Sequence, residues 1–258
     1  MNAQSEERSE SARIVRELGF EVLEWLGATA SSRLCRALRL ADGERALLRV
    51  QKAEPGTPAE LLRFRAEYEL IGSLTLPCVP RALAFLGDGP RPVIALADCP
   101  GRLLEAVLTG PMPLPQALSL GERLSDSLGA FHGAGFVHRD LRPVNVLVTS
   151  DDSAVQLVDL SGAASRDAPP FDESFRGEDL AYVSPEQTGR VRQAIDLRTY
   201  LYSLGVTLFR AFSGKLPFET ADALELVHSH LARTPVSLSR LLPAATCSRG
   251  TIFDTKAM

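Results

Sequence analysis

The chain of 258 residues contains very little lysine, since only Lys52, Lys215 and Lys256 occur among its 28 basic residues. It has no long block of like charge, and its net charge of −4 gives no electrostatic footprint for nucleic acid. It also lacks a long apolar run, because the stretch LYSLGVTLF (201–209) stops at Arg210. We therefore expect neither a nucleic-acid partner nor a membrane span.

Paired cysteines and a signal peptide are also missing. The four cysteines are widely scattered and show no CxxC spacing, so they indicate neither a zinc site nor a disulfide framework. The N-terminus, MNAQSEERSESAR (1–13), is polar and has no apolar core, which excludes a secretory signal there. We expect a disordered leader over 1–13 and a cytoplasmic protein with reduced thiols.

The first part of the chain has the patterns of strands and one helix. Thr57 followed by Pro58 is typical of a helix start, and apolar residues recur at helical spacing after it. Alternating stretches bounded by turn residues indicate strands. The predicted helix covers 57–74, and the predicted strands cover 20–27, 33–40, 45–50, 81–89 and 91–98.

The second part is mainly helical. Helices are predicted over 114–135, 197–214 and 222–233, and two short apolar runs, 145–148 and 155–160, flank the turn TSDDSA. The order of elements indicates an α+β protein with a small antiparallel sheet lobe and a larger helical lobe. The predicted organisation is a sheet lobe over 14–97, a helical lobe over 98–242 and an irregular tail over 243–258.

Polar residues at fixed offsets stand in the stretch FVHRDLRPVNVLV (136–148). Asp140 and Asn145 lie five residues apart on a predicted loop, and Asp159 follows at the far end of the predicted hairpin. Mg²⁺ prefers near-octahedral oxygen ligands, which Asn145 and Asp159 would supply from two directions. Asp140 would then face the hydroxyl that attacks a γ-phosphate.

These stretches resemble the protein kinase family over most of the chain. HRDLRPVN (138–145) is similar to the catalytic loop HRDxxxxN, DLS (159–161) stands where the family has DFG, and SPE (184–186) where it has APE. The block AYVSPEQTGR with LYSLGV after it is similar to bacterial Ser/Thr kinase domains at the N-terminus of large hybrid sensor kinases. The resemblance implies a two-lobed kinase fold with a shortened C-lobe.

The resemblance also implies roles for individual residues. Asp140 would be the base or orienting carboxylate, Arg139 would couple the catalytic loop to the activation segment, and Arg142 would touch the γ-phosphate. ATP and Mg²⁺ would be the cofactors. Residues implied to contact the nucleotide or its metal are Arg49, Glu67, Gly27, Leu96, Ala97, Cys99, Asn145 and Asp159.

Several positions depart from the family pattern. Arg49 stands in place of a lysine, which is not a conservative change at a site built for a point charge. DLS lacks both the Phe and the Gly of DFG, and the phosphate loop keeps only Gly27. Asp179 replaces a threonine of the substrate-facing loop, and Tyr200 replaces a helix aspartate that braces the catalytic loop.

Two functions therefore stay open, and a third is less favoured. One is a Ser/Thr-type kinase that transfers the γ-phosphate of ATP to a protein hydroxyl in bacterial signal transduction. The other is a catalytically impaired pseudokinase that binds a nucleotide or a partner. A small-molecule kinase shares the H-x-D-x-x-x-x-N pattern, but SPEQ (184–187) and the long segment before it argue against that class. The expected partners are a protein substrate and a downstream ATPase or histidine-kinase module.

Overall fold

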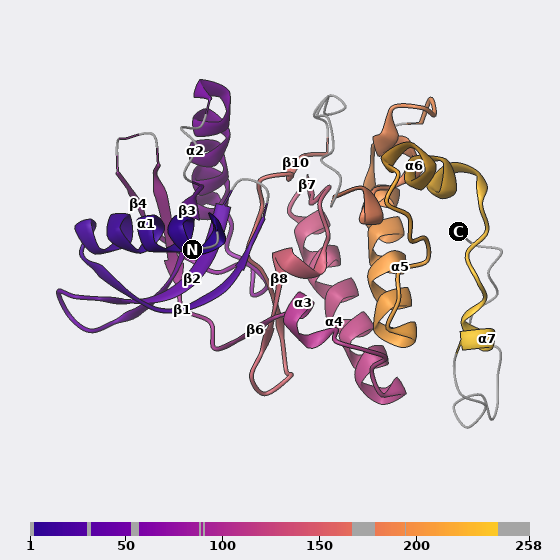
Figure 1. Cartoon of the computed structure of the whole chain (residues 1–258), viewed down its shortest axis with the longest axis horizontal. Coiled ribbons are helices and arrows are strands. Elements are labelled where there is room, and N and C mark those ends of the chain that lie inside the picture. The colour runs from indigo at the N-terminus through magenta and orange to yellow at the C-terminus, as the bar shows by residue number, and fades with distance from the viewer. Residues whose placement is uncertain are drawn as a thin grey trace. The chain divides into compact units, whose positions relative to one another are not determined.

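The computed structural model describes residues 3–29, 32–52, 57–87, 89, 91–166, 179–193 and 195–241 (Figure 1). The chain divides into two compact units, Met1–Leu103 with Val144–Ser161, and Leu104–Pro143 with Gly162–Met258. The division falls after Leu103, whereas the sequence placed it after Ala97, and the segment from Val144 to Ser161 returns to the first unit. The predicted tail 243–258 lies outside the described residues.

The first unit contains an antiparallel sheet in the order β1-β2-β3-β5-β4. The turn between β2 and β3 contains Gly43, which adopts a φ of 74°. The helix α2 (Pro58–Ser73) has the predicted cap, because Thr57 and Glu60 form a capping box. The predicted strands and helix are confirmed as β1 (Phe20–Ala28), β2 (Ser32–Arg39), β3 (Arg45–Gln51), β4 (Ala82–Leu86), β5 (Val93–Ala97) and α2.

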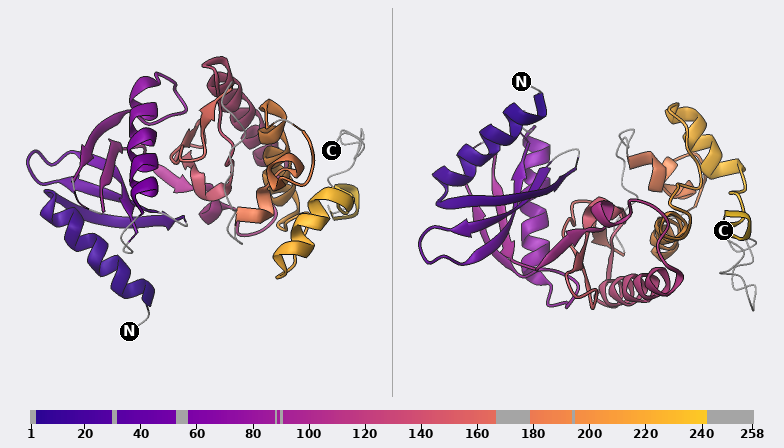
Figure 2. Two further views of the ribbon diagram at one scale, coloured as in Figure 1. Left: turned by 90° about the horizontal axis from the view of Figure 1, so that it is seen from above. Right: turned by 60° about the horizontal axis from the view of Figure 1, so that its bottom comes forward.

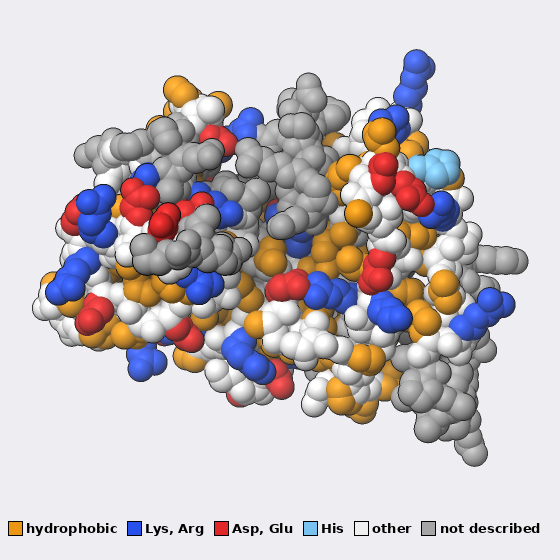
Figure 3. Space-filling model, in the orientation of Figure 1, with side chains coloured by type: hydrophobic (Ala, Val, Ile, Leu, Met, Phe, Trp, Pro, Cys, Tyr) orange, Lys and Arg blue, Asp and Glu red, His pale blue; other side chains and the backbone are white. Residues whose placement is uncertain are grey.

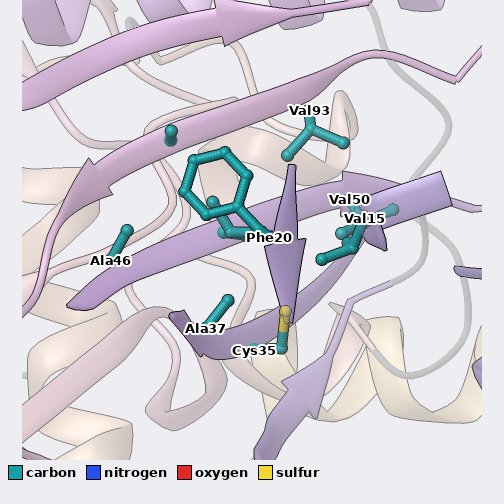
Figure 4. Packing of buried hydrophobic residues seen from close by; sticks show 9 residues of the cluster. Val15, Phe20, Cys35, Ala37, Ala46, Val50 and Val93 are labelled. Carbon is teal, nitrogen blue, oxygen red and sulfur yellow. The ribbon is translucent and has the colours of Figure 1, made fainter. Parts of the chain in front are cut away.

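The two faces of this sheet carry different side chains. One face forms a hydrophobic core with Cys35, Leu48 and Val50 among its fully buried members (Figure 4). Residues paired directly across neighbouring strands share a face. Because Arg49 pairs with Leu34 on β2 and with Ile94 on β5, these three residues lie on the opposite face. Arg49 is therefore buried on the face that does not belong to this core.

The predicted disordered leader is wrong, because residues Ala3–Glu17 form the helix α1. Val15 of this helix is fully buried in the sheet core, and Ser11 is also buried. Glu10 forms an ion pair with Arg91 at 2.7 Å. Most charged residues of α1 are exposed, whereas Val15 is buried. The helix α1 lies beside β1 (Figure 2). Composition alone suggested disorder because the anchoring apolar residues come after the polar stretch.

A second sheet in the first unit joins β6 (Gly101–Leu103), β8 (Val146–Thr149) and β9 (Val155–Leu157) in the order β6-β8-β9. The sequence predicted the β8–β9 hairpin but not β6. A Cβ atom at Gly101 would lie 2.1 Å from the carbonyl oxygen of Val148, so the close approach of β6 to β8 requires glycine there.

The second unit is built around two long helices that pack on each other, α4 (Leu114–Gly133) and α5 (Leu197–Ser213). Both were predicted, as was α6 (Ala223–Ala232). Gly214 ends α5 with a φ of 73°, as the sequence indicated. The unpredicted elements of the unit are short and comprise α3 (Leu104–Val107), β7 (Phe136–Val137), β10 (Ala164–Ser165), η2 (Asp179–Tyr182), η3 (Pro185–Thr188) and α7 (Leu238–Leu241).

Other expectations concern the surface and the thiols. None of the helices in the described ranges is both long enough and apolar enough to cross a bilayer. Cys35, Cys78 and Cys99 carry free thiols, whereas Cys247 lies outside the described residues. On the face shown in Figure 3, basic and acidic side chains are interspersed, so this face has no field of a single sign.

Candidate active site

An arginine on β3 meets a glutamate on α2 inside the first unit. Arg49 donates from Nη1 to Oε1 of Glu67, and the two side chains are 2% and 1% exposed. The capping box at Thr57 fixes the start of α2, and the ring of Phe64 on the same helix lies under the Arg49 guanidinium, 5.5 Å from Cζ. The structure therefore forms the pair that the resemblance implied.

Asp159 belongs to the same buried cluster. Nη2 of Arg49 donates to Oδ2 of Asp159 at 2.8 Å and to Oγ of Ser32 at 2.9 Å. The amide of Leu160 donates to Oε1 of Glu67 at 2.7 Å. Arg49 thus bridges two carboxylates, one from α2 and one from the segment after β9. No pattern in the sequence indicated the contribution of Ser32.

Asn145 and Asp159 stand at the two ends of the β8–β9 hairpin, as predicted. The amide of Val158 donates to the carbonyl of Asn145 at 2.9 Å, which ties the two ends together. Asn145 is fully buried, and Asp159 is 4% exposed. Among the described residues, no three His, Cys, Asp or Glu side chains gather as a metal site. A site here would combine one carboxylate with the amide oxygen of Asn145.

The segment after β5 is held by a residue that sequence reasoning missed. Arg36 on β2 donates to Oδ1 of Asp98 at 2.8 Å and to the carbonyls of Cys99 and Gly101 at 3.0 and 3.2 Å. Burial lowers the pKa of Arg36, but its interactions with Asp98 and Glu24 raise the pKa by more. The pKa of Arg36 therefore lies above its ordinary value. The segment is therefore fixed by a guanidinium that stays charged.

The resemblance implies that Leu96 is the gatekeeper and that residues 97–99, with Ala97 and Cys99 among them, form the hinge whose backbone amides hold adenine. Leu96 is fully buried and pairs with Leu47 on β3. The amide of Ala97 already donates to the carbonyl of Arg81 at 2.8 Å. An amide contact to a purine from this stretch would therefore come from the residues that follow Ala97.

Gly27 lies near the end of β1, where the sequence predicted a loop over phosphates. A Cβ atom at this position would stand 2.4 Å from Cδ1 of Leu103. The absence of a side chain therefore lets Leu103 pack against β1. Residues 30 and 31, which belong to the predicted phosphate loop, lie outside the described residues.

Asp140 lies in the second unit, on the loop after β7. Arg142 holds its carboxylate with two bonds, Nε to Oδ1 at 2.6 Å and Nη2 to Oδ2 at 2.8 Å. A Cβ atom at Gly162 would be 3.0 Å from Cβ of Asp140, so the glycine one place after DLS leaves room for this loop.

The loop is fixed from its other side by Arg139. This residue adopts a φ of 59°, is buried, and has its pKa lowered by burial. Its carbonyl accepts a bond from Nε2 of Gln187 at 2.7 Å, which links the loop to η3. His138 is fully buried, and its ring lies 5.9 Å from the ring of Phe131.

Tyr200 and Glu186 have partners in the second unit. Tyr200 packs its ring 6.2 Å from that of His132, and burial raises the pKa of its hydroxyl. Glu186, the glutamate of SPE, accepts a bond from Oγ1 of Thr199 at 2.7 Å. Asp179, which replaces the threonine, begins η2.

A second network joins three elements of the helical unit. Arg210 on α5 binds both carboxylate oxygens of Glu105 on α3, at 2.7 and 2.6 Å, and also donates to the hydroxyl of Tyr182 at 2.8 Å. The bonds to Glu105 raise the pKa of Arg210, and burial raises that of Tyr182. This network holds the 3-10 helix η2 against the long helix.

A sheet unit with a buried Arg–Glu–Asp cluster and a helical unit with an Asp140 loop define a kinase-like fold. The chain matches the family model described as "Protein kinase domain" over residues 20–247. The chain therefore belongs to the protein kinase family.

Three curated relatives are Ser/Thr protein kinases from bacteria. The chain is 30% identical over 232 residues, 87% of its length, to serine/threonine-protein kinase pkn2 of Myxococcus xanthus. It is 32% identical over 202 residues, 75% of its length, to PkaA of Streptomyces coelicolor, and 31% identical over 210 residues, 78% of its length, to PknA of Mycobacterium tuberculosis. It spans 28%, 36% and 48% of these relatives, respectively.

Proposed function

We propose that this chain is a Ser/Thr-type kinase domain that binds ATP and transfers its γ-phosphate to a hydroxyl of a protein substrate. The observation that carries the proposal is the buried cluster in which Arg49 binds both Glu67 and Asp159. A guanidinium held in one orientation by α2 provides a fixed positive charge for the phosphates. Membership of the protein kinase family supports the same reading.

Nucleotide binding would use the face of the sheet that carries Arg49. Leu96, Ala97 and Cys99 would contact the purine, with the segment held by Arg36. Gly27 would lie near the phosphates, with Arg49 placed by Glu67. These roles rest on the family resemblance together with the contacts within the first unit.

The residues of the β8–β9 hairpin fit Mg²⁺ by the type of donor they offer. Asn145 and Asp159 would hold it through oxygen atoms, which are its preferred ligands. When bound, Mg²⁺ offsets the negative charge of the phosphates. Asp159 already accepts bonds from Arg49 and Ser161, so its carboxylate is oriented before any ligand arrives.

Asp140 would orient the substrate hydroxyl and accept its proton at a carboxylate oxygen. Arg142 donates to both of these oxygens, and each oxygen can accept a second bond, so the hydroxyl would bind Asp140 beside Arg142. The family resemblance implies that Arg142 would also touch the γ-phosphate. Arg139 would couple this loop to the activation segment through the bond from Gln187.

A second candidate is a catalytically impaired module that binds a nucleotide or a partner protein. Two ion pairs favour this candidate, because each one engages a carboxylate that has a proposed role. Arg142 pairs with Asp140, and Arg49 pairs with Asp159. Such contacts hold both groups in place without substrate. The cytoplasmic location, the signalling context and a downstream sensor module stay predictions for either candidate.

The kinase and module readings differ in phosphate transfer. With ATP and Mg²⁺, we expect the wild-type chain to melt at a higher temperature and to label itself with radioactive γ-phosphate. Asp140→Asn should lower the labelling rate by roughly 100- to 10,000-fold, because the proton acceptor is lost.

Asp152→Asn, the same substitution at an exposed hairpin turn, is the matched control and should label normally. A melting shift without labelling would favour the module over the kinase. Labelling that persists in Asp140→Asn would contradict the role of Asp140, and the absence of any shift would contradict nucleotide binding.

A further inference from the structure

Both carboxylate oxygens of the proposed metal ligand Asp159 accept hydrogen bonds. Its Oδ2 accepts a bond from Arg49 at 2.8 Å, and its Oδ1 accepts bonds from the amide and the hydroxyl of Ser161 at 3.0 and 2.6 Å. Each oxygen therefore has a donor. The hydroxyl bond exists only because serine stands at the third position of DLS.

The donors come from two of the positions at which the chain departs from the family pattern. Arg49 stands in place of a lysine, and Ser161 in place of a glycine. An ammonium group is a compact point charge, whereas a guanidinium binds two carboxylates through separate nitrogen atoms. Arg49 uses Nη1 for Glu67 and Nη2 for Asp159, so neither contact has to be given up for the other.

Burial makes these contacts costly to break. The side chains of Arg49 and Asp159 are 2% and 5% exposed, so water does not screen their attraction as it does at the surface. A cation that binds Asp159 must either displace this guanidinium or share the carboxylate with it. Displacement would break the bond from Nη2 of Arg49 to Asp159, although the bond from Nη2 to Oγ of Ser32 could remain.

We propose that Arg49 acts as the resident counter-ion of Asp159, and that this chain therefore binds a nucleoside triphosphate without needing a divalent cation. The proposal rests on the proposed nucleotide site. The positive charge that faces Asp159 is covalently part of the chain, and Ser161 reinforces the arrangement. Phosphate transfer would still use Mg²⁺, because the charge on the transferred group has to be offset.

The test is calorimetric titration of ATP into the whole chain, once with excess MgCl₂ and once with excess EDTA. We expect the two dissociation constants to differ by less than about tenfold, which corresponds to about 1.4 kcal/mol. The readout is binding and does not depend on catalysis.

Two variants test the named residues. Arg49→Lys combined with Ser161→Gly should raise the ratio of the EDTA and MgCl₂ dissociation constants by about tenfold or more, because a metal then becomes the main partner of Asp159. Arg49→Lys alone should raise it by a smaller factor. Arg45→Lys makes the same change at an exposed position of β3 and should keep the wild-type ratio.

The possible outcomes separate this inference from the proposed function. Wild-type binding that requires MgCl₂ would overturn the inference and leave the proposed function intact. Binding in neither buffer would overturn both. An unchanged ratio in the double variant, with wild-type binding in EDTA, would contradict the roles of Arg49 and Ser161.

Discussion

Arg49→Met should lower the free energy of unfolding of the first unit by about 3–5 kcal/mol. The substitution keeps an unbranched side chain but removes the positive charge between Glu67 and Asp159, whose side chains are 1% and 5% exposed. Two buried carboxylates would then lose the positive charge that binds both of them. Removing one partner of a buried ionic cluster costs more than the cluster contributes, because the remaining charges stay desolvated.

The measurement is urea denaturation followed by the fluorescence of Trp25, which is the single tryptophan and lies on β1 of the same unit. Arg45→Met, at an exposed position of the same strand, is the control and should change stability by less than about 0.5 kcal/mol. A loss below about 1 kcal/mol for Arg49→Met would show that the cluster is not buried as described.

Gly214→Ala should lower the free energy of unfolding of the second unit by about 2–5 kcal/mol. Gly214 ends α5 in the left-handed region, with a φ of 73°, where a Cβ atom is strained. The new atom would also stand 2.6 Å from Cδ and 2.8 Å from the backbone nitrogen of Pro111. The nearby bond from Met112 to Ala211, at 2.7 Å, limits how far this segment can move away.

Gly189→Ala separates the two effects, because Gly189 ends η3 with a φ of 68° and has nothing within 4 Å of its Cβ position. This variant should lose only about 1–2 kcal/mol, the cost of the left-handed backbone. Far-UV circular dichroism in urea gives both values. Equal losses for the two variants would contradict the close contact at Pro111.

The long elements could be predicted because their signals are local. Thr57 with Glu60 marks the start of α2, and the turn at Gly43 separates two alternating strands. The helix α1 was missed because its polar composition suggested disorder. Val15 becomes buried only when α1 packs on the sheet, which local composition does not show. The strand β6 was missed for a similar reason, since three residues form a strand only by pairing with β8.

For the candidate site, the sequence supplied the residues and the structure supplied their partners. The pairing of Arg49 with Glu67 followed from the family pattern. The bond from Arg49 to Asp159 joins residues 110 positions apart, and no periodicity indicates it. Arg36 was missed because it belongs to no conspicuous motif. Its partners are Asp98 and two backbone carbonyls. Such contacts depend on which strands become neighbours, which local patterns do not specify.

The most direct test of the central claim is a crystal structure of the chain with a non-hydrolysable ATP analogue. The account predicts that phosphate oxygens lie within hydrogen-bond distance of Arg49, while Arg49 keeps its bond to Asp159 and the purine contacts the segment from Ala97 to Cys99. A structure in which the analogue binds elsewhere, or in which Arg49 points away from the phosphates, would contradict it.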